Sequence, residues 1–378
     1  MASERRKKVI LICISVFLTL LFAEIALRIL GIGAIQRGSP WFAGGNHPRF
    51  LFQEDPASGY TLRPGFRGRE IAPDGEFDTG ATIDGRGLRS HPHTAPARPL
   101  VLALGDSMTF GEGVPVDKTW SATLERTAGV RVENGGVPGY STRQMEGRGR
   151  KLIPLLHPDL VLVTFSPRWD RQRCATPFVY LDGYIVAQGF LPRLYPIDGD
   201  LYLAETRLPV LGPMTAYAKR YSYVARHLLP ALFRPVRAAL RSEPKPVPPG
   251  PDDYRPTADA LDGIREQARK SGAWFLAILI ESRGKDYEVD RDGLEKVLKA
   301  RSIPYLALDA FLAKADWPRL RYAHDQHWNE AGHRTVGQAL APVVAPLKPH
   351  PLSPSPISHP PLPGRGGTPP NLFARTRL

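Results

Sequence analysis

The chain has 378 residues, enough for one α/β domain of about 200–250 residues with attached segments, or for two small domains. Its only cysteines are Cys13 and Cys174, and Cys13 lies in an apolar run, so neither a disulfide framework nor a cysteine metal site is expected. The formal net charge of +13 suits an anionic partner, such as nucleic acid, a lipid surface or an acidic polymer, or reflects a preference for arginine codons. Nucleic acid is not expected as a partner, because the chain carries no helix-turn-helix, zinc-finger or aromatic RNA-binding motif.

The N-terminus predicts a membrane anchor. Residues 1–8 contain four basic side chains and precede an apolar run over residues 9–35, which Glu24 and Arg28 interrupt. The run is long enough to span a bilayer, and the two charged residues lie four apart, so that they can pair on a helix. The basic flank favours a cytoplasmic N-terminus and an exported main domain. A cleaved signal peptide is the alternative, although no small-x-small cleavage site ends the apolar core.

An irregular lead-in and then an α/β alternation are predicted after the anchor. Residues 36–98 are rich in Gly, Pro and Arg and are expected to pack on the domain, with short strands at 59–62 and 81–83. Continuous apolar runs predict strands buried on both faces at residues 99–104, 130–132, 160–165, 274–280 and 305–308. Helices are predicted at residues 117–126 (with Asp117 as its cap), 142–156, 257–270, 292–299 and 330–344.

One segment interrupts this alternation and another follows it. Residues 170–250 hold aromatic and proline-rich loops, a basic stretch with helical spacing at 217–241 and a proline-dense linker at 244–251. This insertion forms a lid, lies against a membrane surface, or packs as a helix on the domain, which is the commonest fate of such a stretch. Residues 346–378 are rich in Pro, Ser and Gly and predict a disordered tail.

Five strands with intervening helices predict an α/β fold for residues 99–345. The expected architecture is a flavodoxin-like, doubly wound parallel five-stranded sheet that follows an N-terminal transmembrane anchor. In such sheets the active site lies beyond the carboxyl ends of the strands. Residues that directly follow the predicted strands are therefore the candidates for chemistry.

A serine stands at the first of these positions. Ser107 follows the first predicted strand of the sheet, in the stretch Gly-Asp-Ser-Met-Thr-Phe-Gly-Glu-Gly of residues 105–113. Small neighbours let a substrate approach, and the amides that follow point into the cleft. Gly-Asp-Ser is also an ordinary turn. A phosphate-binding loop is excluded, because no Gly-Lys-Ser/Thr follows and the Rossmann spacing is absent.

A histidine block lies between the last predicted strand and the last predicted helix. His-Asp-Gln-His-Trp-Asn at residues 324–329 offers His327 as the base that a serine hydroxyl needs, Asp325 as the carboxylate behind it, and Asn329 as a helix cap. His324 and His327 without a third ligand are weak evidence for a metal site, so no metal and no cofactor are expected. Structural roles are expected for the other histidines considered, His91, His93, His324 and His333.

These blocks resemble the SGNH, or GDSL-type, superfamily of serine hydrolases. The resemblance rests on Gly-Asp-Ser-Met at residues 105–108 and on Asp-Gln-His-Trp-Asn-Glu-Ala-Gly-His at residues 325–333. A further block, Asn-Gly-Gly-Val-Pro-Gly-Tyr-Ser-Thr at residues 134–142, follows the second strand as in the family. The lead-in is similar to that of membrane-anchored bacterial members. This implies a single-pass protein of the bacterial inner membrane with an extracytoplasmic catalytic domain.

The resemblance implies roles for the site residues. Ser107 would be the nucleophile, His327 the base and Asp325 the carboxylate that orients the base. The oxyanion hole would use the backbone amides of Ser107 and Gly139, because charge that develops on a carbonyl oxygen needs preorganised donors.

Two departures from the family pattern concern the base and the oxyanion hole. Only Gln326 separates Asp325 from His327, where the family commonly has two residues. The family's third block, Gly-x-Asn-Asp, is replaced here by Ser-Pro-Arg-Trp-Asp, so Arg168 stands where an Asn usually donates to the oxyanion. The Arg168 guanidinium either donates to the oxyanion, binds an acidic substrate group or turns to solvent.

The leading hypothesis is an ester hydrolase or O-acyltransferase that forms an acyl-serine intermediate and acts on O-acyl groups of an envelope carbohydrate. A transferase would need a multi-span partner to supply the acyl donor, since a single span cannot carry a donor across the membrane. The alternative hypothesis is a catalytically weak member that binds a glycan or a protein. A membrane lipase or esterase acting on lipid is a third.

Overall fold

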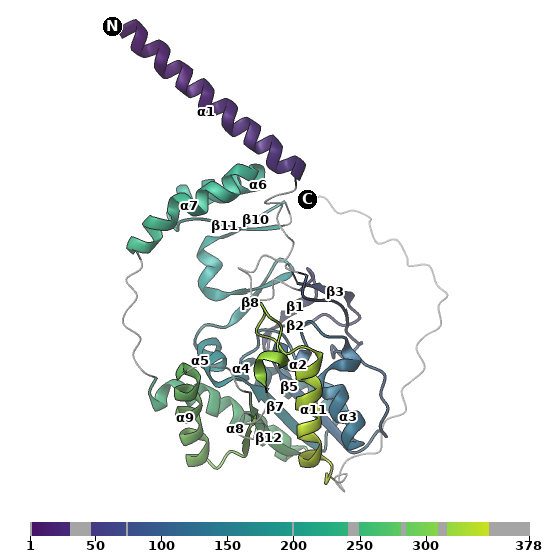
Figure 1. Ribbon diagram of the computed structural model, residues 1–378. Helices are drawn as coiled ribbons and strands as arrows, with labels where there is room; N and C mark the ends of the chain where they lie inside the picture. The colour runs from purple at the N-terminus through teal and green to yellow at the C-terminus, as the bar shows by residue number, and fades with distance from the viewer. Residues whose placement is uncertain are drawn as a thin grey trace, which may run out of the picture.

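A parallel five-stranded sheet forms the centre of the protein (Figure 1). The computed structural model describes residues 2–30, 47–72, 75–198, 200–240, 249–280, 285–308 and 316–347. The strands of the sheet are β5 (Leu100–Gly105), β6 (Arg131–Asn134), β7 (Leu160–Phe165), β12 (Trp274–Leu279) and β13 (Tyr305–Ala307). They lie in the order β13-β12-β7-β5-β6, and every neighbouring pair is parallel. The predicted doubly wound sheet is therefore confirmed, with the order 2-1-3-4-5 of flavodoxin-like folds.

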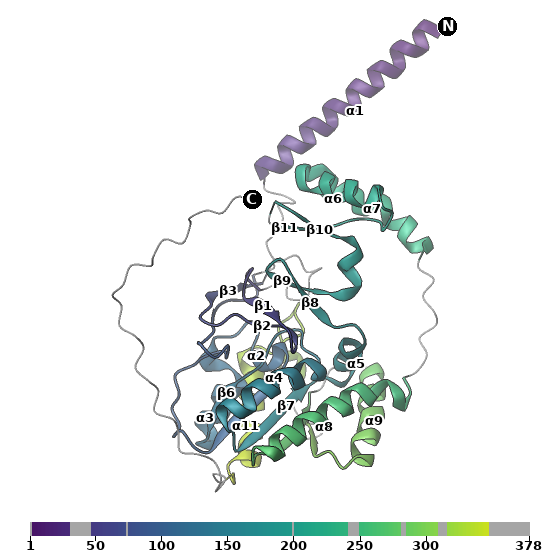
Figure 2. The ribbon, with the colours of Figure 1, turned by 180° about the vertical axis from the view of Figure 1, so that it is seen from behind.

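Helices cover both faces of this sheet (Figures 1 and 2). On one face lie α3 (Trp120–Ala128) and α11 (Glu330–Val344), and on the other lie α4 (Thr142–Leu156), α8 (Arg255–Lys270) and α9 (Lys285–Ala300). Side chains alternate along β5, so that Val101 and Ala103 join the core under α3 and α11, while Leu102 and Leu104 join the core under α4 and α8. Burial on both faces explains why β5 and β7 are continuous apolar runs.

The lead-in has more regular structure than the sequence predicts. It forms the antiparallel hairpins β1–β2 (Phe52–Asp55 and Gly59–Leu62) and β3–β4 (Arg67–Ile71 and Asp78–Thr82). Phe52, Tyr60 and Leu62 are buried in the same core as α4 and α8. The first hairpin therefore shares a hydrophobic core with these helices. The expectation of an irregular segment is wrong, because β2 and β4 each bury every second residue.

The helix limits agree with the sequence patterns except at the starts of α9 and α3: α9 begins at Lys285, seven residues before the predicted start, and α3 has a different cap. Thr119 precedes this helix, and its Oγ1 accepts a hydrogen bond from the amide of Ala122 at 3.3 Å. The predicted cap, Asp117, lies instead in the short 3-10 helix Val116–Lys118. Thr and Asp both cap helices well. Thr119 caps α3 because the residues directly before Thr119, including Asp117, belong to the 3-10 helix.

The insertion leads away from the sheet (Figures 1 and 2). It contains α5 (Pro167–Ala175), the hairpins β8–β9 (Phe178–Leu181 and Tyr184–Ala187) and β10–β11 (Leu194–Ile197 and Asp200–Leu203), the 3-10 helix Gln188–Arg193 between them, α6 (Leu211–Tyr221) and α7 (Tyr223–Leu240). The basic stretch is thus two helices that meet at Ser222. The alternative in which it packs on the α/β domain is wrong, because α6 packs on β10 and β11 and α7 packs on α1 (Ala2–Leu30).

α1 projects from the rest of the chain and is long and apolar enough to cross a membrane over Glu4–Leu30 (Figure 1). The predicted pair is present, with Nε of Arg28 2.7 Å from Oε1 of Glu24. A signal sequence has the same length and composition, so an uncleaved anchor stays a prediction. The end of the predicted anchor, most of the proline-dense linker and nearly all of the predicted tail lie outside the described residues.

Candidate active site

Ser107 begins the short helix α2 (Ser107–Phe110), directly after β5. The side chain of Asp106 caps this helix by accepting a hydrogen bond from the amide of Met108 at 2.9 Å. Gly105 leaves no room for a side chain, since a Cβ there would lie 2.0 Å from Oγ1 of Thr109. The serine therefore stands on a tight strand-to-helix turn at the carboxyl edge of the sheet.

The structure brings the predicted serine, histidine and carboxylate together at this edge. Oγ of Ser107 lies 2.7 Å from Nε2 of His327. On the other side of the ring, Nδ1 of His327 is hydrogen-bonded to Oδ1 of Asp325, which also accepts the amide of His327 at 2.8 Å. One intervening residue is therefore enough for the carboxylate to hold the imidazole. Asn329 caps α11 as predicted, through the amide of Gly332 at 3.1 Å.

Two of the three predicted oxyanion residues, Ser107 and Gly139, lie on neighbouring turns. The amide of Val137 donates to the carbonyl of Gly105 at 2.9 Å, which places the turn of Gly139 beside the serine turn. Gly139 has a φ of +77°, and a Cβ there would lie 2.4 Å from the ring of Phe178, so only glycine fits. Arg168 lies half-buried in the first turn of α5, directly after β7. The role of Ser107, Gly139 and Arg168 in an oxyanion hole stays a prediction.

A buried chain of charged groups reaches the site from the lead-in, and sequence reasoning missed it. Oε2 of Glu112 lies 3.4 Å from Nε2 of His327 and 3.2 Å from Nε2 of His47. Nδ1 of His47 lies 2.7 Å from Oε1 of Glu70, whose Oε2 is 3.8 Å from Nη2 of Arg89. Burial lowers the pKa of His47, but Glu112 and Glu70 outweigh burial and raise it to about 10. Acidic and basic groups thus alternate from Arg89 to His327.

Glu112 carried a signal that the sequence analysis did not use, because it is an acidic residue in the glycine-flanked turn five positions after Ser107. His47 carried no such signal. It stands 60 positions before the serine, in a segment with no periodic pattern, and only the folding of the lead-in brings it to Glu112.

The pKa of His327 is affected more by the nearby carboxylates than by burial. Burial lowers the pKa of this histidine, but the negative charges around it raise the pKa to about 9. The charge of Glu112 is the largest single cause of the rise, Asp325 contributes through both its hydrogen bond and its charge, and the charge of Asp106 adds to them. A protonated imidazole cannot accept the proton of a serine hydroxyl. The imidazole of His327 therefore keeps its proton to higher pH than a free imidazole does.

We expect ester hydrolysis to rise with pH up to about pH 9, because only the neutral form of His327 is a base, and about 1% of the imidazole is neutral two pH units below its pKa. Glu112→Gln removes the charge that raises the pKa of His327 most. The rise in hydrolysis by this variant should therefore lie at lower pH than that of the wild type. The measurement is the pH profile of kcat/KM with a p-nitrophenyl ester, corrected for spontaneous hydrolysis. Glu330→Gln removes an exposed carboxylate of α11 and should keep the wild-type profile. A Glu112→Gln profile that coincides with the wild type would contradict this role of Glu112.

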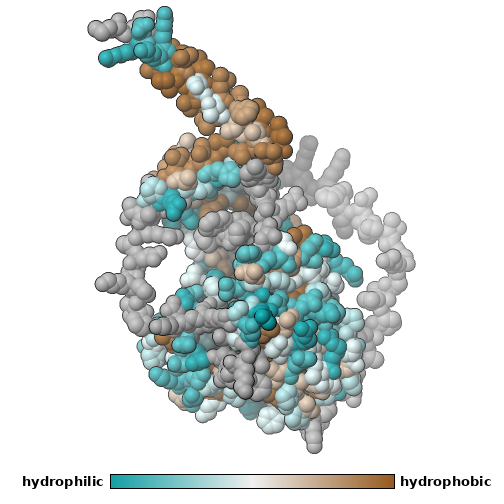
Figure 3. All heavy atoms as spheres, in the orientation of Figure 1, coloured by the Kyte–Doolittle hydropathy of each residue, from teal (hydrophilic) through white to brown (hydrophobic). Residues whose placement is uncertain are grey.

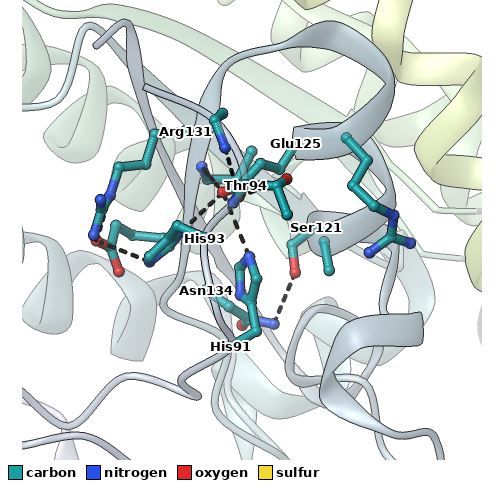
Figure 4. A network of polar contacts seen from close by, with 12 residues as sticks. His91, His93, Thr94, Ser121, Glu125, Arg131 and Asn134 are labelled. Atoms are coloured by element: carbon teal, nitrogen blue, oxygen red, sulfur yellow. Dashed lines mark hydrogen bonds and ion pairs between the residues drawn. The ribbon is translucent and has the colours of Figure 1, made fainter. Parts of the chain in front are cut away.

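A second polar network fastens the end of the lead-in to the domain (Figure 4). Oε1 of Glu125 accepts the amide of Thr94 at 2.6 Å, and Oε2 accepts the amide of Val132 at 3.0 Å. His93 and His91 point at the same carboxylate, with Nδ1 of His93 2.8 Å and Nε2 of His91 3.4 Å from Oε2. Burial raises the pKa of Glu125, but these hydrogen bonds outweigh it and hold the pKa well below its usual range. The two histidines thus contribute to structure.

Two groups of side chains have the spacing of metal ligands, with ligand atoms within 4.8 Å of one another. They are His91, His93 and Glu125, and Glu112, Asp325 and His327. In the first group the carboxylate already accepts three backbone amides, those of Thr94, Ala95 and Val132. In the second group both ring nitrogens of the histidine face hydrogen-bond partners. The expectation of no metal stays a prediction.

Glu125→Ala should destabilise the fold by about 3 kcal/mol, because it leaves buried amides and a buried histidine without their acceptor. The change should appear as a lower urea midpoint of the full-length chain in detergent. Glu266→Ala removes a carboxylate that pairs with Arg269 on the surface of α8 and serves as the control, with an expected effect below about 0.5 kcal/mol. Equal midpoints for the two variants would show that the network does not hold the lead-in.

No protein-family model matches the chain. An arylesterase from Vibrio mimicus is 28% identical over 137 residues, which are 35% of this chain and 64% of the relative. The aligned part thus spans less than two thirds of the curated relative it matches.

Solved structures with a similar fold include a lipase/acylhydrolase from Enterococcus faecalis, 14% identical, which covers 67% of this chain and 98% of its own at a TM-score of 0.37. A GDSL-like lipase from Bacteroides thetaiotaomicron, also 14% identical, covers 66% of this chain and 88% of its own at a TM-score of 0.34.

The motif arrangement resembles that of the SGNH, or GDSL-type, hydrolase superfamily. The parallel sheet has the expected order, Gly-Asp-Ser follows β5, and the Asp-x-His block precedes the last helix at the same edge of the sheet. The relative from Vibrio mimicus is itself an esterase by name, which agrees with the resemblance of the motifs.

Proposed function

We propose that the protein is a serine esterase or O-acyltransferase in which Ser107 is the nucleophile, His327 the base and Asp325 the carboxylate that orients the base. The observation that carries this proposal is the continuous hydrogen-bonded chain from the serine hydroxyl through both ring nitrogens to the carboxylate. A serine hydroxyl is a weak nucleophile until a neighbouring base takes its proton. The arylesterase relative supports ester chemistry in particular.

The reaction would pass through an acyl-serine intermediate. His327 takes the hydroxyl proton as Ser107 attacks the ester carbonyl, and gives it to the leaving alcohol as the ester bond breaks. The oxyanion would receive hydrogen bonds from the amides of Ser107 and Gly139, with Arg168 as a further donor. Water then completes hydrolysis, or a sugar hydroxyl completes transfer. A transferase would depend on a multi-span partner that supplies the acyl donor.

The proposed substrate is an O-acylated carbohydrate of the cell envelope. The basis is the anchor, which would hold the domain outside the inner membrane. A lipase acting on lipid is a second candidate, because the apolar helices α6 and α7 lie beside α1. Preference among acyl chain lengths separates the two: a carbohydrate esterase should favour acetyl esters, and a lipase should favour long chains.

The test uses the full-length chain in detergent and a fluorophosphonate probe, followed by intact mass. One covalent adduct is expected, together with hydrolysis of p-nitrophenyl acetate and release of acetate from an O-acetylated polysaccharide. Release without a sugar acceptor indicates hydrolysis, and acetyl transfer to an added oligosaccharide indicates transferase activity. No adduct on a folded chain would overturn the proposal and favour a glycan-binding member of the fold.

A further inference from the structure

α6 is held on the insertion by one face. Gly212, Thr215 and Ala216 are buried against the hairpin β10–β11. Oγ1 of Thr215 accepts the amide of Glu205 at 3.1 Å, and Nζ of Lys219 donates to the carbonyl of Leu203 at 2.8 Å. These contacts fix the rotation of the helix, so its opposite face is a fixed outward surface.

That outward surface is apolar. On α6 the exposed side chains recur every three or four residues, which places them on one stripe, and α7 continues the stripe with two leucines one turn apart. They are Leu211 (37% exposed), Met214 (61%), Tyr217 (49%), Tyr221 (58%), Leu228 (45%) and Leu232 (65%). Figure 3 shows apolar residues over α6 and α7 beside the apolar surface of α1, with hydrophilic residues on the side toward the domain.

α1 is joined to the start of α7 by a polar junction. Oε1 and Oε2 of Glu24 accept the amides of Tyr223 and Val224, each at 3.0 Å, and Oε2 accepts the hydroxyl of Ser222 at 2.8 Å. Arg28 donates to the carbonyl at the end of α6 at 2.6 Å. The carboxylate thus satisfies amides that the first turn of a helix leaves free. The junction fixes the position along the axis of α1 at which α7 begins, next to Glu24.

The start of α7 lies at a position along α1 that matches a membrane interface. Glu24 stands six residues before the end of α1, which is about 9 Å along the helix axis. An amphipathic helix that lies on a bilayer sinks about 5–10 Å below the headgroup boundary. If α1 crosses the membrane up to its last turn, α7 therefore starts at the depth of an interfacial helix. The two helices run across the base of α1 rather than alongside its length (Figures 1 and 2).

The charge of the segment suits the same surface. Residues 206–240 contain five arginines, one lysine and no aspartate or glutamate. Lys219 pairs with Glu205 and Arg220 with Asp198, whereas Arg207 and Arg234 are exposed. Basic side chains next to an anionic leaflet contribute about 1 kcal/mol each. A surface that combines an apolar stripe with exposed basic side chains is typical of helices that bind anionic bilayers.

We propose that α6 and α7 form an interfacial arm that lies on the outer leaflet of the membrane crossed by α1. Met214, Tyr217, Leu228 and Leu232 would lie in the acyl region, with the exposed Arg207 and Arg234 at anionic headgroups. The arm and α1 together hold the insertion, and through it the α/β domain, against the membrane surface. The stripe is continuous with a helix whose apolar surface needs lipid, which favours a bilayer over a second copy of the chain as its occupant.

The test is depth measurement by spin labelling of the full-length chain in vesicles. Cys13→Ala leaves Cys174, which is buried, with burial raising its thiol pKa to about 12, and which should stay unlabelled. Labels are placed by Met214→Cys and Leu232→Cys, and Lys270→Cys on the exposed end of α8 is the control. Accessibility to oxygen should exceed accessibility to a water-soluble nickel complex at the first two positions, and the order should be reversed at the control.

Vesicles of two lipid compositions test whether the basic side chains of the arm bind anionic headgroups. The labels should lie deeper in vesicles of phosphatidylcholine with phosphatidylglycerol than in phosphatidylcholine alone, and equal depths would overturn the role of the basic residues. Free access of the nickel complex at Met214→Cys and Leu232→Cys in both compositions would overturn the arm itself. Spin–spin broadening between labels at a low protein-to-lipid ratio would assign the stripe to a second copy instead.

Discussion

Ser107→Ala and His327→Ala should each lower ester hydrolysis by about 10⁴-fold or more, and the double variant should be no worse than either single one. The two side chains act as one unit, because the hydroxyl attacks only while the imidazole takes its proton, so the loss of either removes the whole advantage. The measurement is kcat/KM at pH 9 with a p-nitrophenyl ester, together with the rate of fluorophosphonate labelling. Both variants should lose the adduct.

The control for this pair is Ser271→Ala, which removes a serine at the carboxyl end of α8 and should leave rate and labelling unchanged. An adduct that survives in Ser107→Ala would place the reactive nucleophile elsewhere. A double variant much worse than both single variants would mean that Ser107 and His327 act independently. Either result would contradict the proposed pathway through the hydrogen bond between them.

The sheet could be predicted from the sequence because its strands are local signals. β5 and β7 are six-residue apolar runs buried on both faces, and β7 begins and ends at the predicted residues. The helices α4 and α11 likewise match, since His157 in a left-handed conformation ends the first and Asn329 caps the second. The serine and histidine blocks follow from the same pattern, because each stands at the carboxyl edge of the predicted sheet.

The features that could not be predicted depend on contacts between distant parts of the chain. His47 reaches Glu112 only after the lead-in has folded into hairpins that bury alternate residues. The placement of α7 depends on Glu24, about 200 positions earlier, because the carboxylate accepts two amides of α7. The sequence showed that Glu24 could pair with Arg28, but its hydrogen bonds to α7 have no local signature.

The charged groups around the imidazole change how the proposed site should behave. A serine hydrolase commonly has one carboxylate behind its histidine, whereas here Glu112 lies on the side of the ring that faces Ser107. After the imidazole has taken the serine proton, Glu112 is placed to stabilise the positive charge. Before that step it opposes the neutral form. The expected result is an enzyme that is slow at neutral pH and gains rate in alkaline solution.

Asp325→Asn should lower kcat/KM at pH 9 by about 10⁴-fold, because the carboxylate fixes which ring nitrogen of His327 carries the proton. With Asp325 ionised, Nδ1 donates to Oδ1 and the lone pair of Nε2 faces Ser107. An asparagine amide that donates to Nδ1 would favour the other tautomer, with the proton on Nε2 and no base beside the serine. Protein stability and the circular dichroism spectrum should change little.

The matched comparison is Glu112→Gln, because both carboxylates raise the pKa of His327 but contact opposite sides of its ring. If Asp325 orients the ring and Glu112 only adjusts its charge, the loss at pH 9 should be large for Asp325→Asn and small for Glu112→Gln. The reverse order would assign the orienting role to Glu112. In that case Glu112, next to Nε2, would determine which ring nitrogen of His327 carries the proton. Asp325 would then mainly hold the backbone of the turn, by accepting the amide of His327.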